Sequence, residues 1–137
     1  MNLEARVRKS FALQGLMQTL SASVTRVAAG EVEILMPVSS AISQQHGFVH
    51  AAAVTAIMDS ACGYAALSLM PEDSDVLAVE FKVNFVAPAT GSSIRAIGSV
   101  IKAGKTLTLT TANAFAISSD GEKLIAVMQA TMIRSPI

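Results

Sequence analysis

One aspartate stands alone in a long apolar stretch of the sequence. Between His50 and Met70, Asp59 is the only charged side chain, and most of the other residues are alanine or larger apolar residues. As a helix this segment is apolar on every side, so other structure should surround it. Moving an unpaired carboxylate out of water costs on the order of several kcal/mol. Asp59 therefore needs a partner, a wet cleft or a chemical use.

The residues around the predicted start of this helix offer further groups for chemistry. His50 precedes Asp59 by nine residues, and Gln44 precedes His50 by six. The backbone N–H groups of a first helical turn have no partner inside the helix and lie at the positive end of its dipole. The N–H of Ala51 can therefore polarise a carbonyl oxygen.

Other candidate ligands and nucleophiles in this stretch have simpler explanations. His46 and His50 are four residues apart, a spacing that zinc sites use on helices, but Gly47 and the predicted loop place them off a regular helix. Cys62, the only cysteine, is best explained as a small buried apolar residue. We predict no metal site and no cofactor.

Composition limits the class of protein. A length of 137 residues suits one domain, 1–137, with a helical segment at 1–20. Hydrophobic residues make up 52%, the formal charge is zero and tryptophan is absent, which argues against a nucleic-acid partner. Neither a long apolar run nor a signal peptide is found, so we expect a cytoplasmic protein with no membrane contact. The low charge favours an oligomer.

The remaining pattern predicts an α+β fold in which a strongly curved antiparallel sheet wraps the long central helix. The last four strands should form an antiparallel meander, because their connections are short. The predicted elements are a helix broken at Gly15, a hairpin or one bent strand at 21–37, a polar loop at 39–47, the apolar helix at about 50–70, and strands at 77–85, 94–102, 106–117 and 124–133.

Several motifs together resemble one known family. These are QQHGFVH, the aspartate nine residues after its second histidine, then ACGYAA, and later VEFKVNFVAPA. They resemble the hotdog-fold thioesterases of the phenylacetic-acid-degradation (PaaI-like) family over roughly residues 32–132. The resemblance implies subunits paired sheet edge to sheet edge, as a homodimer or homotetramer, and acyl-CoA thioesters hydrolysed in clefts at the dimer interface.

The resemblance also implies roles for individual residues. Asp59 matches the catalytic carboxylate, His50 the histidine at the helix start, and Gln44 the loop amide, while Ala51 supplies the N–H for the oxyanion. Asp59 acts as general base or as nucleophile, and the sequence leaves both routes open. The chain departs from the family in having Ala51-Ala52 where Gly-Gly is frequent, and Ala78 where some members have a hydroxyl that orients water.

CoA carries phosphate groups, so the resemblance implies basic residues at the mouth of the cleft. A glycine there lets the backbone approach the ligand closely. The candidates are Lys82, Lys102, Gly104, Lys105 and Arg134, for which a solvated sheet edge is an equally good explanation.

The predicted function is hydrolysis of medium-chain or aryl acyl-CoA thioesters to free acid and CoA. Two alternatives stay open. A non-catalytic protein that binds acyl-CoA or an acyl carrier is favoured by the alanine departures, and a hotdog hydratase would need its histidine and aspartate closer together. The predicted walls of the acyl pocket are Phe48, Met58, Cys62 and Tyr64.

Overall fold

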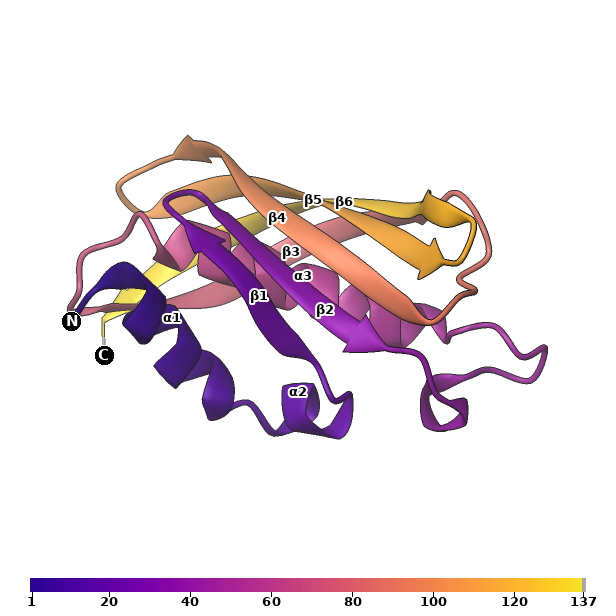
Figure 1. The fold of residues 1–137 in the computed structure, drawn as a ribbon. Coiled ribbons are helices and arrows are strands. Elements are labelled where there is room, and N and C mark those ends of the chain that lie inside the picture. The colour runs from indigo at the N-terminus through magenta and orange to yellow at the C-terminus, as the bar shows by residue number, and fades with distance from the viewer. Residues whose placement is uncertain (137) are drawn as a thin grey trace.

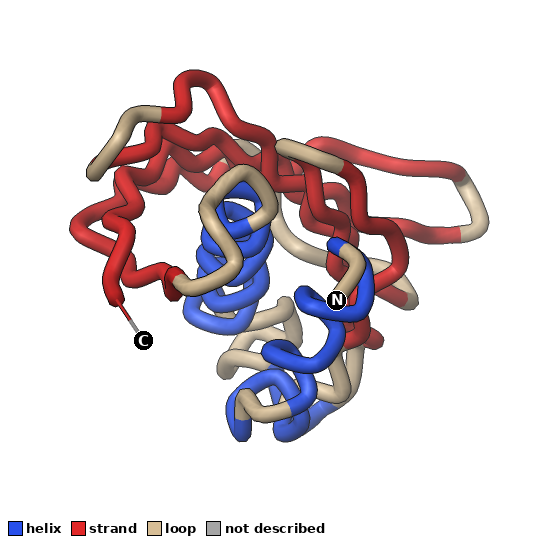
Figure 2. The backbone as a smooth tube through the Cα atoms, turned by 90° about the vertical axis from the view of Figure 1, so that its left-hand side faces the viewer, coloured by secondary structure: helices blue, strands red, loops and turns tan. Residues whose placement is uncertain are grey.

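The computed structural model of the protein describes residues 1–136, in which a curved sheet covers one long helix (Figure 1). Seen along the helix axis, the sheet curls over α3 while α1 and α2 lie below the sheet on its open side (Figure 2). In chain order the elements are α1 (Leu3–Ala12), α2 (Gly15–Thr19), β1 (Ser23–Ala28), β2 (Glu31–Pro37), the short 3-10 helix η1 (Ser40–Ile42), α3 (Ala51–Leu67), β3 (Ser74–Phe85), β4 (Ser93–Ala103), β5 (Leu107–Ser118) and β6 (Gly121–Pro136).

The sheet is antiparallel throughout, with the strand order β1-β2-β4-β5-β6-β3. This confirms the predicted α+β class, a curved antiparallel sheet around a long helix. The predicted meander holds for β4, β5 and β6, but the place given to β3 is wrong. Because β4 pairs with β2 on one side and β5 on the other, no edge is free for β3. It pairs with β6 instead and forms one edge of the sheet.

Helix α3 forms the centre of the core. It has 17 residues and is therefore about 25 Å long at 1.5 Å per residue. Ile57, Met58 and Ala61 are fully buried. Gly98 of β4 allows the helix to approach the sheet closely, since a Cβ there would lie 2.4 Å from the backbone of Ala61.

Helix α1 is tied to the end of α3 by one arginine. The guanidinium of Arg6 donates hydrogen bonds to the carbonyl oxygens of Leu67, Met70, Pro71 and Ser74, at 3.3, 2.9, 2.8 and 3.0 Å. The last carbonyls of a helix have no partner inside it, and a cation at that end also interacts favourably with the helix dipole. Arg6 thus holds the N-terminal helices in place beside α3.

Candidate active site

Asp59 lies midway along α3 and borders a small cavity of about 210 Å³. Its Oδ1 atom is buried and has no hydrogen-bond partner among residues 1–136. Burial raises the pKa of this carboxyl group, because the charged form loses hydration. A carboxylate in such surroundings is a stronger base than one in water, and it is free to act on water or a ligand in the cavity.

The start of α3 presents one free backbone donor. His50 is the N-cap residue: its Nδ1 accepts a hydrogen bond from the N–H of Ala52 at 2.9 Å, and its carbonyl oxygen accepts from the N–H of Ala53 at 3.0 Å. Within the described residues the N–H of Ala51 has no partner. The cap therefore fixes the helix start and leaves the Ala51 N–H open to a ligand.

Gln44 shapes the loop that leads into this helix. Its Oε1 accepts hydrogen bonds from the backbone N–H groups of His46 and Phe48, and its own backbone N–H donates to the carbonyl oxygen of Phe48 at 2.8 Å. The side-chain NH₂ has no partner within residues 1–136. It is the part of Gln44 that is left to bind a ligand.

The structure brings three of the four predicted catalytic residues together. Gln44, His50 and Ala51 border one mainly apolar groove of about 650 Å³. Asp59 borders the other cavity, and it lies eight positions after Ala51, which corresponds to about 12 Å of helix. Within one chain, the carboxylate and the helix start form two separate half sites.

Strand β3 connects these two half sites. Residues 75–78 at its start line the cavity of Asp59, and residues 85–89 at and after its end line the groove at the helix start. The strand has a neighbour on one side only. Its exposed apolar side chains are Leu77, Val79, Phe81 and Phe85, each between 43% and 60% exposed.

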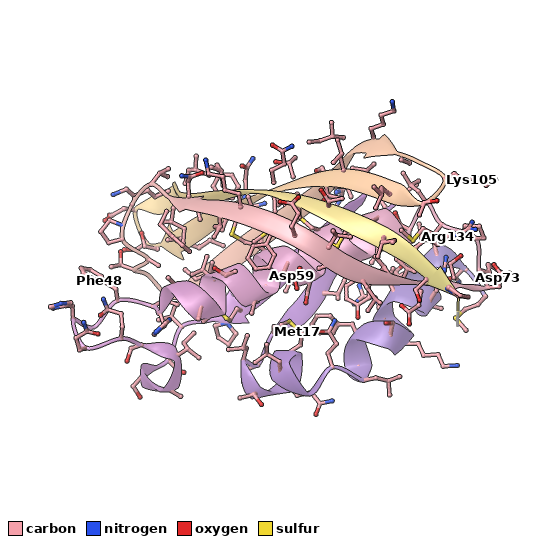
Figure 3. All side chains as sticks on the ribbon, turned by 180° about the vertical axis from the view of Figure 1, so that it is seen from behind. Met17, Phe48, Asp59, Asp73, Lys105 and Arg134 are labelled. Atoms are coloured by element: carbon pink, nitrogen blue, oxygen red, sulfur yellow. The ribbon has the colours of Figure 1, made fainter. Side chains whose placement is uncertain are left out.

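The predicted CoA contacts lie apart from the groove of their own chain. Lys82 is on β3, Lys102 is near the end of β4, and Lys105 is in the turn between β4 and β5. Figure 3 places Lys105 near Arg134, at the end of the molecule opposite Phe48. Binding of CoA by these residues stays a prediction.

Gly104 has a structural explanation in the same turn. Its N–H donates to the carbonyl oxygen of Leu107 at 2.9 Å, and a Cβ at this position would lie 2.3 Å from that oxygen. The tight turn between β4 and β5 therefore favours glycine whether or not a ligand approaches.

The predicted acyl-pocket walls are divided between the two half sites and the core. Tyr64 lines the cavity of Asp59, and Phe48 lines the groove. Met58 and Cys62 are fully buried and border neither space. Burial raises the pKa of the Cys62 thiol to about 11, so this residue stays protonated and is no nucleophile.

The sequence did not predict the polar residues Ser10, Gln14 and Ser60 of the Asp59 cavity. Ser10 comes from α1, Gln14 from the short link to α2, and Ser60 from α3 beside Asp59. Among the described residues no three His, Cys, Asp or Glu side chains gather where they could hold a metal ion. No helix in that part of the chain has the length and apolar character to cross a membrane.

The fold is shared with solved structures of thioesterases. A thioesterase family protein from Silicibacter pomeroyi is 47% identical, with 99% of this chain and 100% of that chain covered and a TM-score of 0.97. A Staphylococcus aureus thioesterase is 25% identical over 90% of this chain and 100% of that one, with a TM-score of 0.82.

The PaaI protein of the Escherichia coli phenylacetic acid degradation operon is 16% identical, with coverage of 97% and 93% and a TM-score of 0.86. This likeness shows the hotdog fold alone, so membership of the PaaI-like subfamily stays a prediction. Residues 46–121, more than half of the chain, match the thioesterase superfamily. The chain belongs to the thioesterase superfamily, and the predicted hotdog fold and thioesterase class are confirmed at that level.

Proposed function

We propose that this protein hydrolyses acyl-CoA thioesters in a site shared by two copies of the chain. One copy contributes Asp59, and the other contributes Gln44, His50 and Ala51. The observation that carries the proposal is the arrangement of two incomplete half sites at opposite ends of the unpaired edge strand β3.

Antiparallel pairing of two β3 strands would complete both sites. In a dimer with a two-fold axis at the middle of β3, the start of one strand lies beside the end of the other. The cavity at residues 75–78 of one copy then faces the groove at residues 85–89 of the other. The same pairing covers the exposed apolar side chains of an edge that a monomer would leave open to aggregation.

The chemistry follows from the groups that meet there. The thioester carbonyl oxygen accepts hydrogen bonds from the N–H of Ala51 and the NH₂ of Gln44, which stabilise the oxyanion. Asp59 of the other copy takes a proton from the attacking water, or attacks the carbonyl carbon itself to form an anhydride that water then opens. The C–S bond breaks, the CoA thiolate takes up a proton, and the free acid is released. His50 holds the helix start through its cap.

The S. aureus relative supports the choice of two of these residues. Two of its solved structures are alanine mutants, one of a glutamine and one of a glutamate. The interval between those two residues equals the interval between Gln44 and Asp59. A carboxylate and an amide at this separation are thus present in a relative that is itself called a thioesterase enzyme.

The test is steady-state release of CoA thiol from a panel of aliphatic and aryl acyl-CoAs. Asp59→Asn keeps the shape and removes the base, so we expect a loss of at least about 100-fold. Asp75→Asn is the matched control, because Asp75 lines the same cavity but its side chain accepts a hydrogen bond from the N–H of Val76. It should keep activity within a few fold. Binding of acyl-CoA without thiol release by the wild type would favour the non-catalytic alternative instead.

A further inference from the structure

One wall of the Asp59 cavity is a polar cluster formed between the N-terminal segment and α3. The Nε2 of Gln14 donates to the hydroxyl of Tyr64 at 2.8 Å, and the hydroxyls of Ser10 and Tyr64 are hydrogen-bonded at 3.1 Å. The hydroxyl of Ser60 donates to Oε1 of Gln14 at 3.3 Å. All four residues line the cavity, and Tyr64 is only 4% exposed.

The hydrogen-bond inventory of this cluster leaves two donors unused. Gln14 has two side-chain N–H bonds, and one of them has no partner among residues 1–136. Ser10 and Tyr64 have one hydroxyl hydrogen each, and their mutual contact uses only one of the two. Ser10 and Gln14 are half-buried at the edge of the cavity, so the unused donors are open to a polar group of a ligand.

The size of the cavity decides which part of a thioester can enter it. About 210 Å³ corresponds to roughly seven water molecules at 30 Å³ each. The CoA arm is far larger and has the groove of about 650 Å³ available at the other half site. The small cavity beside Asp59 is therefore left for a short acyl group.

The lining also sets the charge and position of the polar group. Tyr64 is five residues beyond Asp59, or about 7 Å along the helix, so the cluster would meet the far end of a short acyl chain. Val76, Leu77 and Met132 give an apolar wall for the methylene groups. The charged side chains of the lining are acidic and none is basic, which disfavours an acyl group that ends in a carboxylate.

We propose that Gln14 and Tyr64, with Ser10, select short acyl groups whose far end carries a neutral hydrogen-bonding group such as a hydroxyl. The inference rests on the proposed function, because it assigns the acyl side of the same site. It makes the N-terminal segment, which lies outside the part of the chain that matches the superfamily, a determinant of specificity.

The test compares three acyl-CoAs of equal length: hexanoyl-CoA, ω-hydroxyhexanoyl-CoA and adipoyl-CoA. For the wild type, kcat/KM should be about 10-fold higher for the hydroxylated substrate than for hexanoyl-CoA, the scale of one net hydrogen bond. For adipoyl-CoA, whose far end is a carboxylate, kcat/KM should be at least about 10-fold lower than for hexanoyl-CoA. The ratio between two substrates on one enzyme preparation cancels any loss of folded protein.

Substitutions locate the origin of the preference. Gln14→Leu and Tyr64→Phe should each bring the hydroxyl preference to within about 2-fold of unity while hydrolysis of hexanoyl-CoA continues. Gln18→Leu, in α2 four residues after Gln14 but outside the cavity, is the matched control and should keep the wild-type ratio. Should Tyr64→Phe fail to fold, the Gln14→Leu result decides.

Two outcomes distinguish this inference from the proposed function. Equal use of the three substrates by the wild type, or a preference that survives Gln14→Leu, overturns the inference and leaves the thioesterase in place. A wild type that hydrolyses no acyl-CoA overturns the proposed function and this inference with it.

Discussion

Replacing Ala51 by proline removes one N–H group and leaves the backbone of the fold intact. Ala51 is the first residue of α3, a position where proline is favoured. His50 before it has φ −61° and ψ 136°, the extended conformation that a residue preceding proline prefers. Because the Ala51 N–H has no partner in residues 1–136, no hydrogen bond of the fold is lost. We expect the free energy of unfolding to stay unchanged or to rise by up to about 1 kcal/mol.

The expected loss is in catalysis. Removal of one oxyanion donor lowers kcat by about 10² to 10³, or about 2.7–4 kcal/mol of transition-state stabilisation. The assay is thiol release from the best acyl-CoA, beside a thermal melt of the same preparation. Ala51→Gly keeps the N–H and removes only the methyl group, so it should keep wild-type activity or exceed it. A folded Ala51→Pro enzyme with the wild-type kcat would refute the role given to the helix start.

Three further predictions concern stability. Because burial raises the pKa of Asp59, the folded state holds the proton of this carboxyl group more tightly than the unfolded chain does. The wild type should therefore lose stability relative to Asp59→Asn as the pH rises from about 3.8 through the raised pKa. A difference in the free energy of unfolding, measured by urea melts of the two proteins, that stays constant with pH would contradict this expectation. Gly98→Ala should lower the free energy of unfolding by about 1–3 kcal/mol through overpacking, whereas Gly15→Ala, with open space around it, should not lower it. Arg6→Ala should lower the free energy of unfolding by about 1.5–3 kcal/mol in the same melts. Its control, Arg26→Ala, removes an exposed ion pair and should lower the free energy of unfolding by less than about 1 kcal/mol. Equal losses in the two variants would mean that Arg6 does not hold α1 to α3.

Much of the fold could be predicted because its elements have local signals. The apolar run after His50 predicted α3, and the pattern at 21–37 predicted a hairpin or one bent strand, which the structure resolves as the hairpin of β1 and β2. The alternating pattern at 77–85 predicted a strand correctly. It did not predict the neighbours of β3, because alternation reports the two faces of a strand and says nothing about which edge it occupies.

The candidate site divides in the same way. Gln44, His50 and Ala51 were predicted to act together, and a short loop that leads directly into a helix does place them in one groove. The distance from Ala51 to Asp59 also follows from the helix rise. Ser10 and Gln14 had no local signal. They reach the cavity only because the chain folds back on α3, where they contact Tyr64, a residue 54 and 50 positions later in the sequence.

The shared site is tested most directly by combining two inactive variants. Asp59→Asn and Ala51→Pro should each be nearly inactive alone, since each damages every site of its own dimer. After unfolding and refolding as an equal mixture, half of the dimers should be mixed, and each mixed dimer contains one intact site and one doubly damaged site. The mixture should recover about a quarter of the wild-type activity. If the mixture is no more active than the two variants measured separately, Asp59 and the helix start do not act across two copies of the chain.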